Sequence, residues 1–266
     1  MACVEPSEID GGVPQSARIW NYWLGGKDNY EADRTAGDAV LEQIPDIADG
    51  ARAERAFLIR VVRYLVAECG IRQFLDVGTG LPTLNNTHEV AQATDPTCRI
   101  VYADNDPIVM AHARALLVGT PEGATAYLHA DLREPDAILD AAKRTLDFDQ
   151  PVGLMLLGVV NHIMDDAEAY DSVARLVAAL APGSMMVLTH STAEVHGEPM
   201  LRVMRETTER GGTPIRARDR GEIARFFDGM ELLEPGVVSC SRWRPDAVDV
   251  GEPREVYLFG GVGRTG

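Results

Sequence analysis

Apolar and polar positions along this chain follow two periods, one typical of amphipathic helices and one typical of buried strands. In residues 51–69, Phe57, Val61 and Leu65 recur at steps of four, while arginines occupy other positions. This spacing predicts an amphipathic helix, and Gly70 suits its carboxyl end. The shorter apolar runs that follow are bounded by glycine, proline or acidic residues, as buried strands are.

The order of these segments predicts an α/β fold. Strands are expected at residues 74–77, 98–103, 124–129, 152–157, 185–189, 231–238 and 256–261. Helices are expected between the first five strands, at residues 87–93, 108–118, 135–146 and 167–180, and then at 199–210 and 220–227. Such alternation favours a mostly parallel sheet with right-handed crossovers. The last two strands have no helix between them, so one of them should be antiparallel.

The first 50 residues are read as a polar tail followed by a helical arm, and residues 51–266 as the main domain. Two short helices are expected, at residues 16–24 and 32–44, with Gly25-Gly26 between them and Pro45 after them. Four aromatic side chains lie in or beside this break: Trp20, Tyr22, Trp23 and Tyr30. The arm is therefore predicted to fold over a ligand as a lid, or simply to pack onto the main domain, and both readings can hold together.

Composition narrows the classes of partner. The 266 residues include 45% hydrophobic types, enough for one sizeable core. Lysine and arginine number 25 against 41 acidic residues, and the net charge of −16 disfavours nucleic acid and anionic membranes. The four cysteines form no CxxC pair, so neither zinc nor a disulfide framework is expected. No signal peptide and no membrane-spanning apolar run is recognised, and a cytoplasmic location is expected.

The segment QFLDVGTGLPT, residues 73–83, is the centre of the functional argument. An apolar strand ends at Asp76-Val77 and passes directly into Gly78-Thr79-Gly80. Glycines at such a turn let the backbone approach a ligand, as in the first turn of dinucleotide-binding domains. Alone this signal is weak, because two glycines after a strand often mark only a tight turn.

Acidic residues at the ends of the next two strands strengthen the signal. Asp104, followed by Asn105, stands 24 positions after Gly80, where Rossmann-like domains place the carboxylate that binds ribose hydroxyls. Asp131 and Leu132 follow the third strand, beside the expected adenine position. The alternative is that these acids cap helices, a role that suits Asp106 better than Asp104.

The kind of nucleotide follows from charge. A nicotinamide-dependent oxidoreductase would favour a third glycine at position 83, which is Thr83 here. A rim of three acids instead suits a ligand that combines ribose and adenine with a positive centre. S-adenosyl-L-methionine (SAM) has all three.

Several segments resemble the successive motifs of class I SAM-dependent methyltransferases: QFLDVGTGLPT, RIVYADNDP, HADLREP, GVVNHI and LAPGSMMVLTHS. SARIWNYWLGGKDNYEADR, GTGLPT, NDP and SRWRP together resemble, more narrowly, the S-adenosyl methyltransferase family. The resemblance implies a Rossmann-like, seven-stranded sheet with one antiparallel strand. It implies that Gly78, Thr79 and Gly80 lie along the methionine part of SAM, with Asp104 on the ribose and Asp131 near the adenine. The further cofactor-binding residues expected are Asp76, Asn105, Leu132 and Gly158. From the aromatic residues around Gly25-Gly26, Tyr22 or Tyr30 is expected to cover the cofactor. Pro82 departs from the general superfamily, which has a third glycine there.

The resulting hypothesis is a SAM-dependent methyltransferase acting on a small-molecule acceptor. Asn161, His162 and His190 are the polar residues expected near the acceptor, and His162 is the candidate general base. A satisfied loop histidine is the alternative for His162. A SAM-binding sensor or partner protein without methyl transfer is the alternative function, and a nucleotide-dependent oxidoreductase is a third. The acceptor and the oligomeric state are left open.

Overall fold

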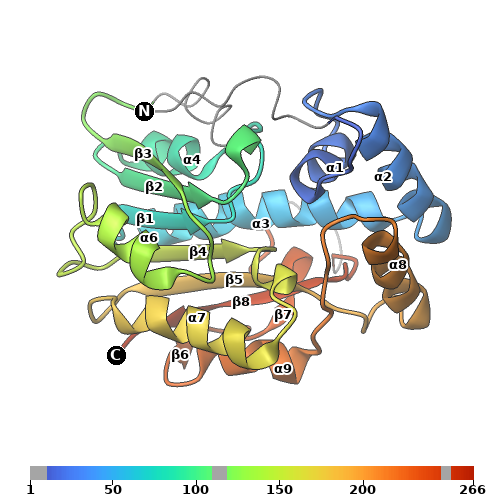
Figure 1. Ribbon diagram of the computed structural model, residues 1–266. Coiled ribbons are helices and arrows are strands. Elements are labelled where there is room, and N and C mark those ends of the chain that lie inside the picture. Colours follow the sequence, from blue (N-terminus) through green and yellow to red (C-terminus); the bar gives the residue numbers. More distant parts are fainter. Residues whose placement is uncertain (1–10, 110–118, 247–252) are drawn as a thin grey trace.

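The computed structural model describes residues 11–109, 119–246 and 253–266, and its centre is an eight-stranded sheet (Figure 1). The strands are β1 (Gln73–Val77), β2 (Arg99–Asp104), β3 (Ala124–His129), β4 (Gly153–Leu157), β5 (Met185–Ser191), β6 (Glu231–Leu232), β7 (Val238–Ser239) and β8 (Leu258–Arg264). Their order is β3-β2-β1-β4-β5-β8-β6, with β7 also paired to β8. Strands β1 to β5 are mutually parallel, and β8 runs antiparallel to β5, β6 and β7.

Helices cover both faces of the sheet and gather at one of its ends. They are α1 (Ser16–Trp23), α2 (Glu31–Gln43), α3 (Ile47–Ala67), α4 (Thr87–Thr94), α6 (Pro135–Ala142), α7 (Asp166–Ala178), α8 (Glu198–Glu209) and α9 (Arg220–Ala224). One buried cluster joins α3 and α4 to the sheet, and a second joins α6, α7 and α9 to its other face. Helices α1, α2 and α8 lie together at the right-hand end of the sheet in Figure 1. No helix in the described ranges is long and apolar enough to cross a membrane.

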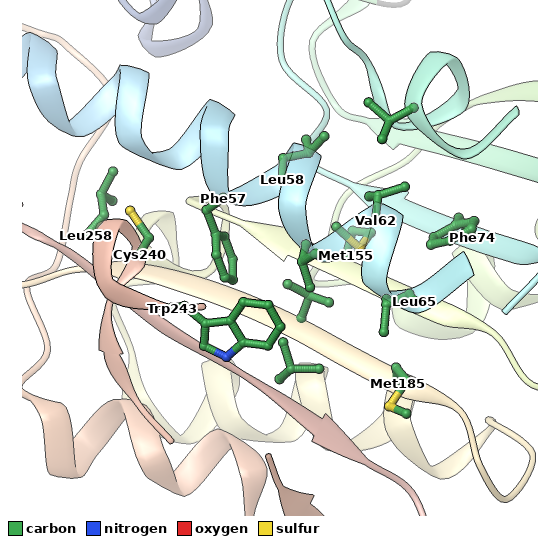
Figure 2. Close-up of a cluster of buried hydrophobic side chains, with 14 of the residues drawn as sticks. Phe57, Leu58, Val62, Leu65, Phe74, Met155, Met185, Cys240, Trp243 and Leu258 are labelled. Atoms are coloured by element: carbon green, nitrogen blue, oxygen red, sulfur yellow. The ribbon is translucent and has the colours of Figure 1, made fainter. Parts of the chain in front are cut away.

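Helix α3 is held on the sheet by the apolar stripe that its sequence predicts. Phe57, Leu58, Val62 and Leu65 point from α3 towards the strands, with Trp243 packed beside Phe57 (Figure 2). The rings of Phe57 and Trp243 meet edge to face with centroids 5.5 Å apart. Burying each such side chain contributes about 1.5–3 kcal/mol, so the helix is firmly positioned over the sheet.

The sequence-based prediction of the fold class is confirmed, and its element boundaries need correction. The strand expected at residues 231–238 is two short strands, β6 and β7. Pro235 lacks a backbone N–H for the ladder and Gly236 turns with φ +81°, so the segment cannot continue as one strand. Helix α3 begins at Ile47, earlier than expected, because Ile47 and Ala48 are already buried. Residues 110–118 of the helix expected at 108–118 lie outside the described residues, as do residues 1–10 of the tail.

Candidate functional site

A cavity of about 770 Å³ lies at the carboxyl ends of the parallel strands. Loops after β1, β2, β3 and β4 form one side of it, and helices α1, α2, α3 and α8 form the other. Eleven of the site residues that the sequence analysis selected line this cavity: Asp76, Gly78, Thr79, Gly80, Asp104, Asn105, Asp131, Leu132, Gly158, Asn161 and His162. The structure therefore brings most of the expected site together in one place.

The turn after β1 requires its two glycines for different reasons. Gly78 and Gly80 adopt φ +76° and +63°, values that a side chain disfavours. A Cβ atom on Gly78 would lie 2.4 Å from Val159, so this glycine permits the close approach of β1 and β4. A Cβ atom on Gly80 would meet no heavy atom of the described chain within 4 Å. Gly80 also lines the cavity, so its bare backbone is exposed to a ligand.

Asp104 is held by the backbone at the end of β2. Its Oδ2 accepts a hydrogen bond from the Gly80 N–H at 3.0 Å, and its Oδ1 accepts one from the Asp106 N–H at 2.9 Å. Burial raises the pKa of this carboxyl, and the two backbone hydrogen bonds oppose that rise. Each oxygen retains a further acceptor position, so Asp104 can receive two hydroxyl protons from a ligand.

Asp131 is the most firmly ionised acid of the site. The Arg133 guanidinium donates to both of its oxygens, at 2.9 and 2.6 Å, and holds the pKa of the Asp131 carboxyl well below its usual range. The Asn105 amide donates to Asp131 Oδ2 at 2.9 Å. The side chain of Asn105 thus joins the ends of β2 and β3.

Asp76 lies at the opposite extreme of ionisation. It is buried at the end of β1, and the Thr87 hydroxyl donates to its Oδ2 at 2.5 Å. Burial raises the pKa of Asp76 to about 6, while Thr87 and the Arg55 guanidinium lower it. A cationic ligand group in the cavity would favour its ionised form.

Two charged residues of α3 line the cavity and were missed by the sequence analysis. Glu54 is buried, and its Oε1 accepts a hydrogen bond from the Thr189 hydroxyl. Burial raises the pKa of Glu54 to about 7. Glu54 shares one face of α3 with Leu58, Val61 and Leu65, at steps of three and four. An acid in an apolar helix stripe is the sequence signal that would have found it.

Arg55, the next residue, is half-buried in the cavity wall. Its guanidinium donates only a long 3.5 Å hydrogen bond, to the Asn85 carbonyl, and makes no ion pair with any part of the chain that the structure describes. Burial lowers its pKa, opposed by Glu54 and Asp76. The site therefore offers one cation to an anionic ligand group.

The part of the cavity away from the acids is apolar. Its lining includes side chains from α1, α2 and α8: Ile19, Trp20, Trp23, Ala36, Val40, Met200, Val203 and Met204. The rings of Trp20 and Trp23 lie 6.0 Å apart between centroids. These helices come from opposite ends of the chain, and together they form the wall that faces the strand ends.

The arm contributes its tryptophans rather than the expected tyrosines. Neither Tyr22 nor Tyr30 lines the cavity. The Tyr22 hydroxyl donates to Asp38 at 2.7 Å, on the exposed side of the arm. Tyr30 is 43% exposed and stacks against Arg18, whose guanidinium lies 5.1 Å from the ring centroid. The arm therefore presents Trp20 and Trp23 to the cavity, and the two tyrosines that were expected to cover the ligand lie away from it.

The two histidines differ in their access to the cavity. His162 lines the cavity. Its Nδ1 lies 2.9 Å from the Pro214 carbonyl oxygen. Because a carbonyl oxygen can only accept, this hydrogen bond requires the proton to be on Nδ1. Burial lowers the pKa of His162. His190 is fully buried, with Nε2 2.8 Å from the Arg218 guanidinium, and burial lowers its pKa to about 3. His190 does not reach the cavity, so it is a structural residue and its expected place near the acceptor is wrong.

No three His, Cys, Asp or Glu side chains within the described ranges are grouped so as to hold a metal ion. Four buried side-chain atoms of the cavity lining have no protein partner there: Thr79 Oγ1, Thr83 Oγ1, Asn161 Oδ1 and Tyr257 Oη. Buried polar groups are normally satisfied, so these atoms are available to hydrogen-bond a ligand in the cavity.

Comparisons with known proteins agree with this geometry. Residues 3–266 match the model of the S-adenosyl methyltransferase family. The crystal structure of a DUF574 family protein from Streptomyces avermitilis superposes with a TM-score of 0.92 and 43% identity, over 97% of this chain and 99% of that one. A candidate methyltransferase from Thermobifida fusca superposes with a TM-score of 0.88 and 39% identity, over 99% of both chains. No curated protein matches. The chain belongs to the S-adenosyl methyltransferase family, and its cofactor is S-adenosyl-L-methionine.

Proposed function

We propose that this chain transfers the methyl group of SAM to a small-molecule acceptor. The observation that carries the proposal is the single cavity that joins the acid-rich strand ends to the apolar wall of α1, α2 and α8. Its volume of about 770 Å³ lies in the upper part of the range of small-molecule sites, roughly 300–1,000 Å³. There is room for a cofactor and a second small ligand side by side.

The residues at the strand ends fit the nucleoside part of SAM. Asp104 has acceptor positions left for both ribose hydroxyls, since its present hydrogen bonds use one position on each oxygen. Leu132 offers apolar surface beside the expected adenine position, whereas Arg133 and Asn105 already occupy the acceptor positions of the Asp131 carboxylate. The hydroxyls of Thr79 and Thr83 are buried without partners in the described chain, so both can hydrogen-bond the cofactor.

The residues around β1 fit the amino-acid part. Gly80 leaves the backbone open to a close approach, and Gly78 holds the turn against β4. Asp76 is a carboxylate for the ammonium group of the cofactor, and Arg55 is a cation for its carboxylate. The two opposite charges of the amino-acid end thus find opposite partners on adjacent elements.

The cofactor supplies an electrophilic methyl group on a positively charged sulfur, and the chain's own residues have to position, desolvate and deprotonate the acceptor. We propose that helices α1 and α2 act as a lid, with Trp20 and Trp23 excluding water from the acceptor. His162 is a poor base, because the pKa of its imidazole is lowered by burial. Its Nε2 has no protein donor among the described residues, so it suits the role of a hydrogen-bond acceptor for a neutral group.

Calorimetry with SAM and with NAD tests the cofactor site. Asp104→Ala should weaken SAM binding by roughly tenfold to a hundredfold, since charge-assisted hydrogen bonds contribute about 1.5–3 kcal/mol. The matched control is Asp140→Ala, which removes an exposed acid on α6 that pairs with Lys143. Binding of NAD in preference to SAM, or equal SAM affinity in the Asp104 variant, would remove this assignment.

Incubation with labelled SAM and a broad metabolite extract tests the reaction. A labelled small product supports methyl transfer. Tight SAM binding without any labelled product, accompanied by a SAM-dependent change in assembly, would replace the enzyme by a SAM-binding sensor.

A further inference from the structure

We propose that Glu54, Asn161 and Tyr257 form the polar end of the acceptor half of the cavity, and that they bind a primary amine of an otherwise apolar acceptor. Glu54 takes the proton that this amine must lose before it is methylated. The proposal rests on the methyl transfer proposed above, and it names the class of acceptor.

Two of these side chains approach one point and the third packs against the same helix, although the three come from distant segments. Glu54 Oε1 lies 3.4 Å and Asn161 Oδ1 3.9 Å from the same point, the position that a Cβ atom on Gly158 would occupy. The ring of Tyr257 packs against Gly50, one helical turn before Glu54 on α3. All three residues line the cavity, and each is less than 10% exposed, at 7%, 3% and 4%.

Glu54 is fixed in this position by a relay that leaves one oxygen available. The Gly158 N–H donates to Thr189 Oγ1 at 2.9 Å, and the Thr189 hydroxyl in turn donates to Glu54 Oε1. Neither a hydrogen bond to Oε2 nor an ion pair of Glu54 occurs among the residues that the structure describes. A buried carboxylate is costly without a cationic partner, so the site favours a ligand that brings one.

The number of acceptor atoms favours an amine over a hydroxyl. Asn161 Oδ1 is buried and has no donor among the described residues. Glu54 Oε2, for which no donor occurs in the described ranges either, lies 3.7 Å from the same Cβ position on Gly158. A hydroxyl group can donate one hydrogen and would satisfy only one of these oxygens. An ammonium group has three donors and can satisfy both, with the Tyr257 oxygen as a third acceptor.

The rest of the acceptor should be apolar. The wall that continues from this cluster is built from the tryptophans of α1 and from Met200, Val203 and Met204 of α8. Methionine side chains adapt to ligands of different shape and pack well against aromatic rings. An arylalkylamine combines the cationic end and the apolar body that the two parts of the site require.

The chemistry balances without a further reactant. The acceptor ammonium passes one proton to the Glu54 carboxylate, and the free amine then attacks the methyl carbon. The new N–C bond forms as the C–S bond breaks, and its electron pair neutralises the sulfonium. The product is a methylammonium ion, and Glu54 releases its proton to water. Arg55, Tyr257 and Cys240 are the other titratable groups that interact with Glu54, and none of them ion-pairs with it in the described ranges.

The ammonium group of the cofactor is the alternative occupant, and the test separates the two. Binding of phenethylamine, tryptamine and 1-naphthylmethylamine is measured by calorimetry at pH 8 with the demethylated cofactor present, each beside its matched alcohol. We expect at least one amine to bind about tenfold more tightly than its alcohol, and Glu54→Gln to abolish that preference. Glu54→Asp should retain part of it. Glu68→Gln, which alters an exposed acid at the end of α3, is the matched control.

Two results would overturn the proposal. In the first, no amine binds more tightly than its matched alcohol. In the second, the preference for the amine persists in Glu54→Gln. Either result would mean that Glu54 does not bind the acceptor. A tenfold loss of SAM affinity in Glu54→Gln, with amine binding unchanged, would assign the carboxylate to the cofactor instead. SAM binding is measured in a separate titration of the wild-type chain, and failure to bind SAM at all would count against the proposed function itself.

Discussion

The two halves of the cavity are built in different ways. The half proposed for the cofactor takes its acids from the ends of β1, β2 and β3, with Arg55 of α3 beside them. Backbone N–H groups hold two of these acids: Gly80 and Asp106 donate to Asp104, and Arg133 donates to Asp131. The acceptor half joins α1, α3, α8 and the approach to β8. Its one buried acid, Glu54, is held by the hydroxyl of Thr189, which lies 135 positions away.

This difference separates what is shared by methyltransferases from what is specific to one. A nucleoside site made of strand ends and their turns depends on short local motifs, and any protein that binds SAM in this way needs similar ones. An acceptor site made of helices from distant segments can change without disturbing those motifs. The first half therefore indicates the cofactor, and the second half the substrate.

The largest effect on stability is expected from alanine substitutions in the glycine turn of the cofactor half. Gly78→Ala should destabilise the protein by about 2–5 kcal/mol, because the left-handed backbone costs about 1–2 kcal/mol and the contact with Val159 adds an overpacking cost of about 1–3 kcal/mol. Gly80→Ala carries only the first cost, but its methyl group points into the cavity and should weaken SAM binding. Denaturant unfolding and calorimetry measure the two effects.

Gly70→Ala is the matched control for this pair. Gly70 also has a positive φ, +71°, with no heavy atom of the described chain near its Cβ position, but it follows α3 and does not line the cavity. The Gly70→Ala variant should lose as much stability as Gly80→Ala does, but it should bind SAM as tightly as the wild type. If Gly80→Ala binds SAM as tightly as the control does, the cofactor does not approach this turn.

The same contrast explains what the sequence predicted and what it did not. The glycine turn and the acids at the strand ends are local patterns, so Gly78, Gly80, Asp104 and Asp131 were identified without a structure. Glu54 was missed because its role depends on the packing of α3 against β5, which no local motif specifies. The tyrosines of the arm were selected in place of the tryptophans that line the cavity for a related reason. Composition indicates that aromatic residues are present, but the rotation of the helix decides which of them face inward.

The next prediction concerns the stability cost of the buried acid in the acceptor half. Burial raises the pKa of Glu54 from 4.5 to about 7, so the protonated form is favoured in the folded state. The stability that the protonated Glu54 side chain contributes is fully present below pH 4.5, and it is lost as the pH rises through about 7. Glutamine resembles the protonated acid, so Glu54→Gln should stabilise the protein at pH 8 by about 1–3 kcal/mol and have little effect at pH 4.5.

Denaturant unfolding at both pH values checks this expectation, with Glu68→Gln as the exposed control on the same helix. Asp76, whose pKa is also raised, to about 6, is present in every variant and cancels in the difference. Equal stability of wild type and Glu54→Gln at pH 8 would mean that the carboxylate is solvated or paired. The acceptor half would then lack the unsatisfied charge that distinguishes it from the cofactor half.

The smallest effects are expected in the arm, where the aromatic side chains divide between the cavity and solvent. Tyr22→Phe removes a single exposed hydrogen bond to Asp38, and Tyr30→Phe removes a hydroxyl from a ring that is 43% exposed. Each should change stability by less than about 1 kcal/mol and leave SAM affinity within about twofold.

Trp20→Ala instead removes part of the cavity wall and should weaken binding of the aromatic amines several-fold, because the ring contributes apolar contact area. The calorimetric series with SAM and the amines measures all three variants. A tenfold loss of SAM affinity in either tyrosine variant would show that the arm rotates on binding and brings the tyrosines to the cofactor, and the boundary between the two halves would have to be redrawn.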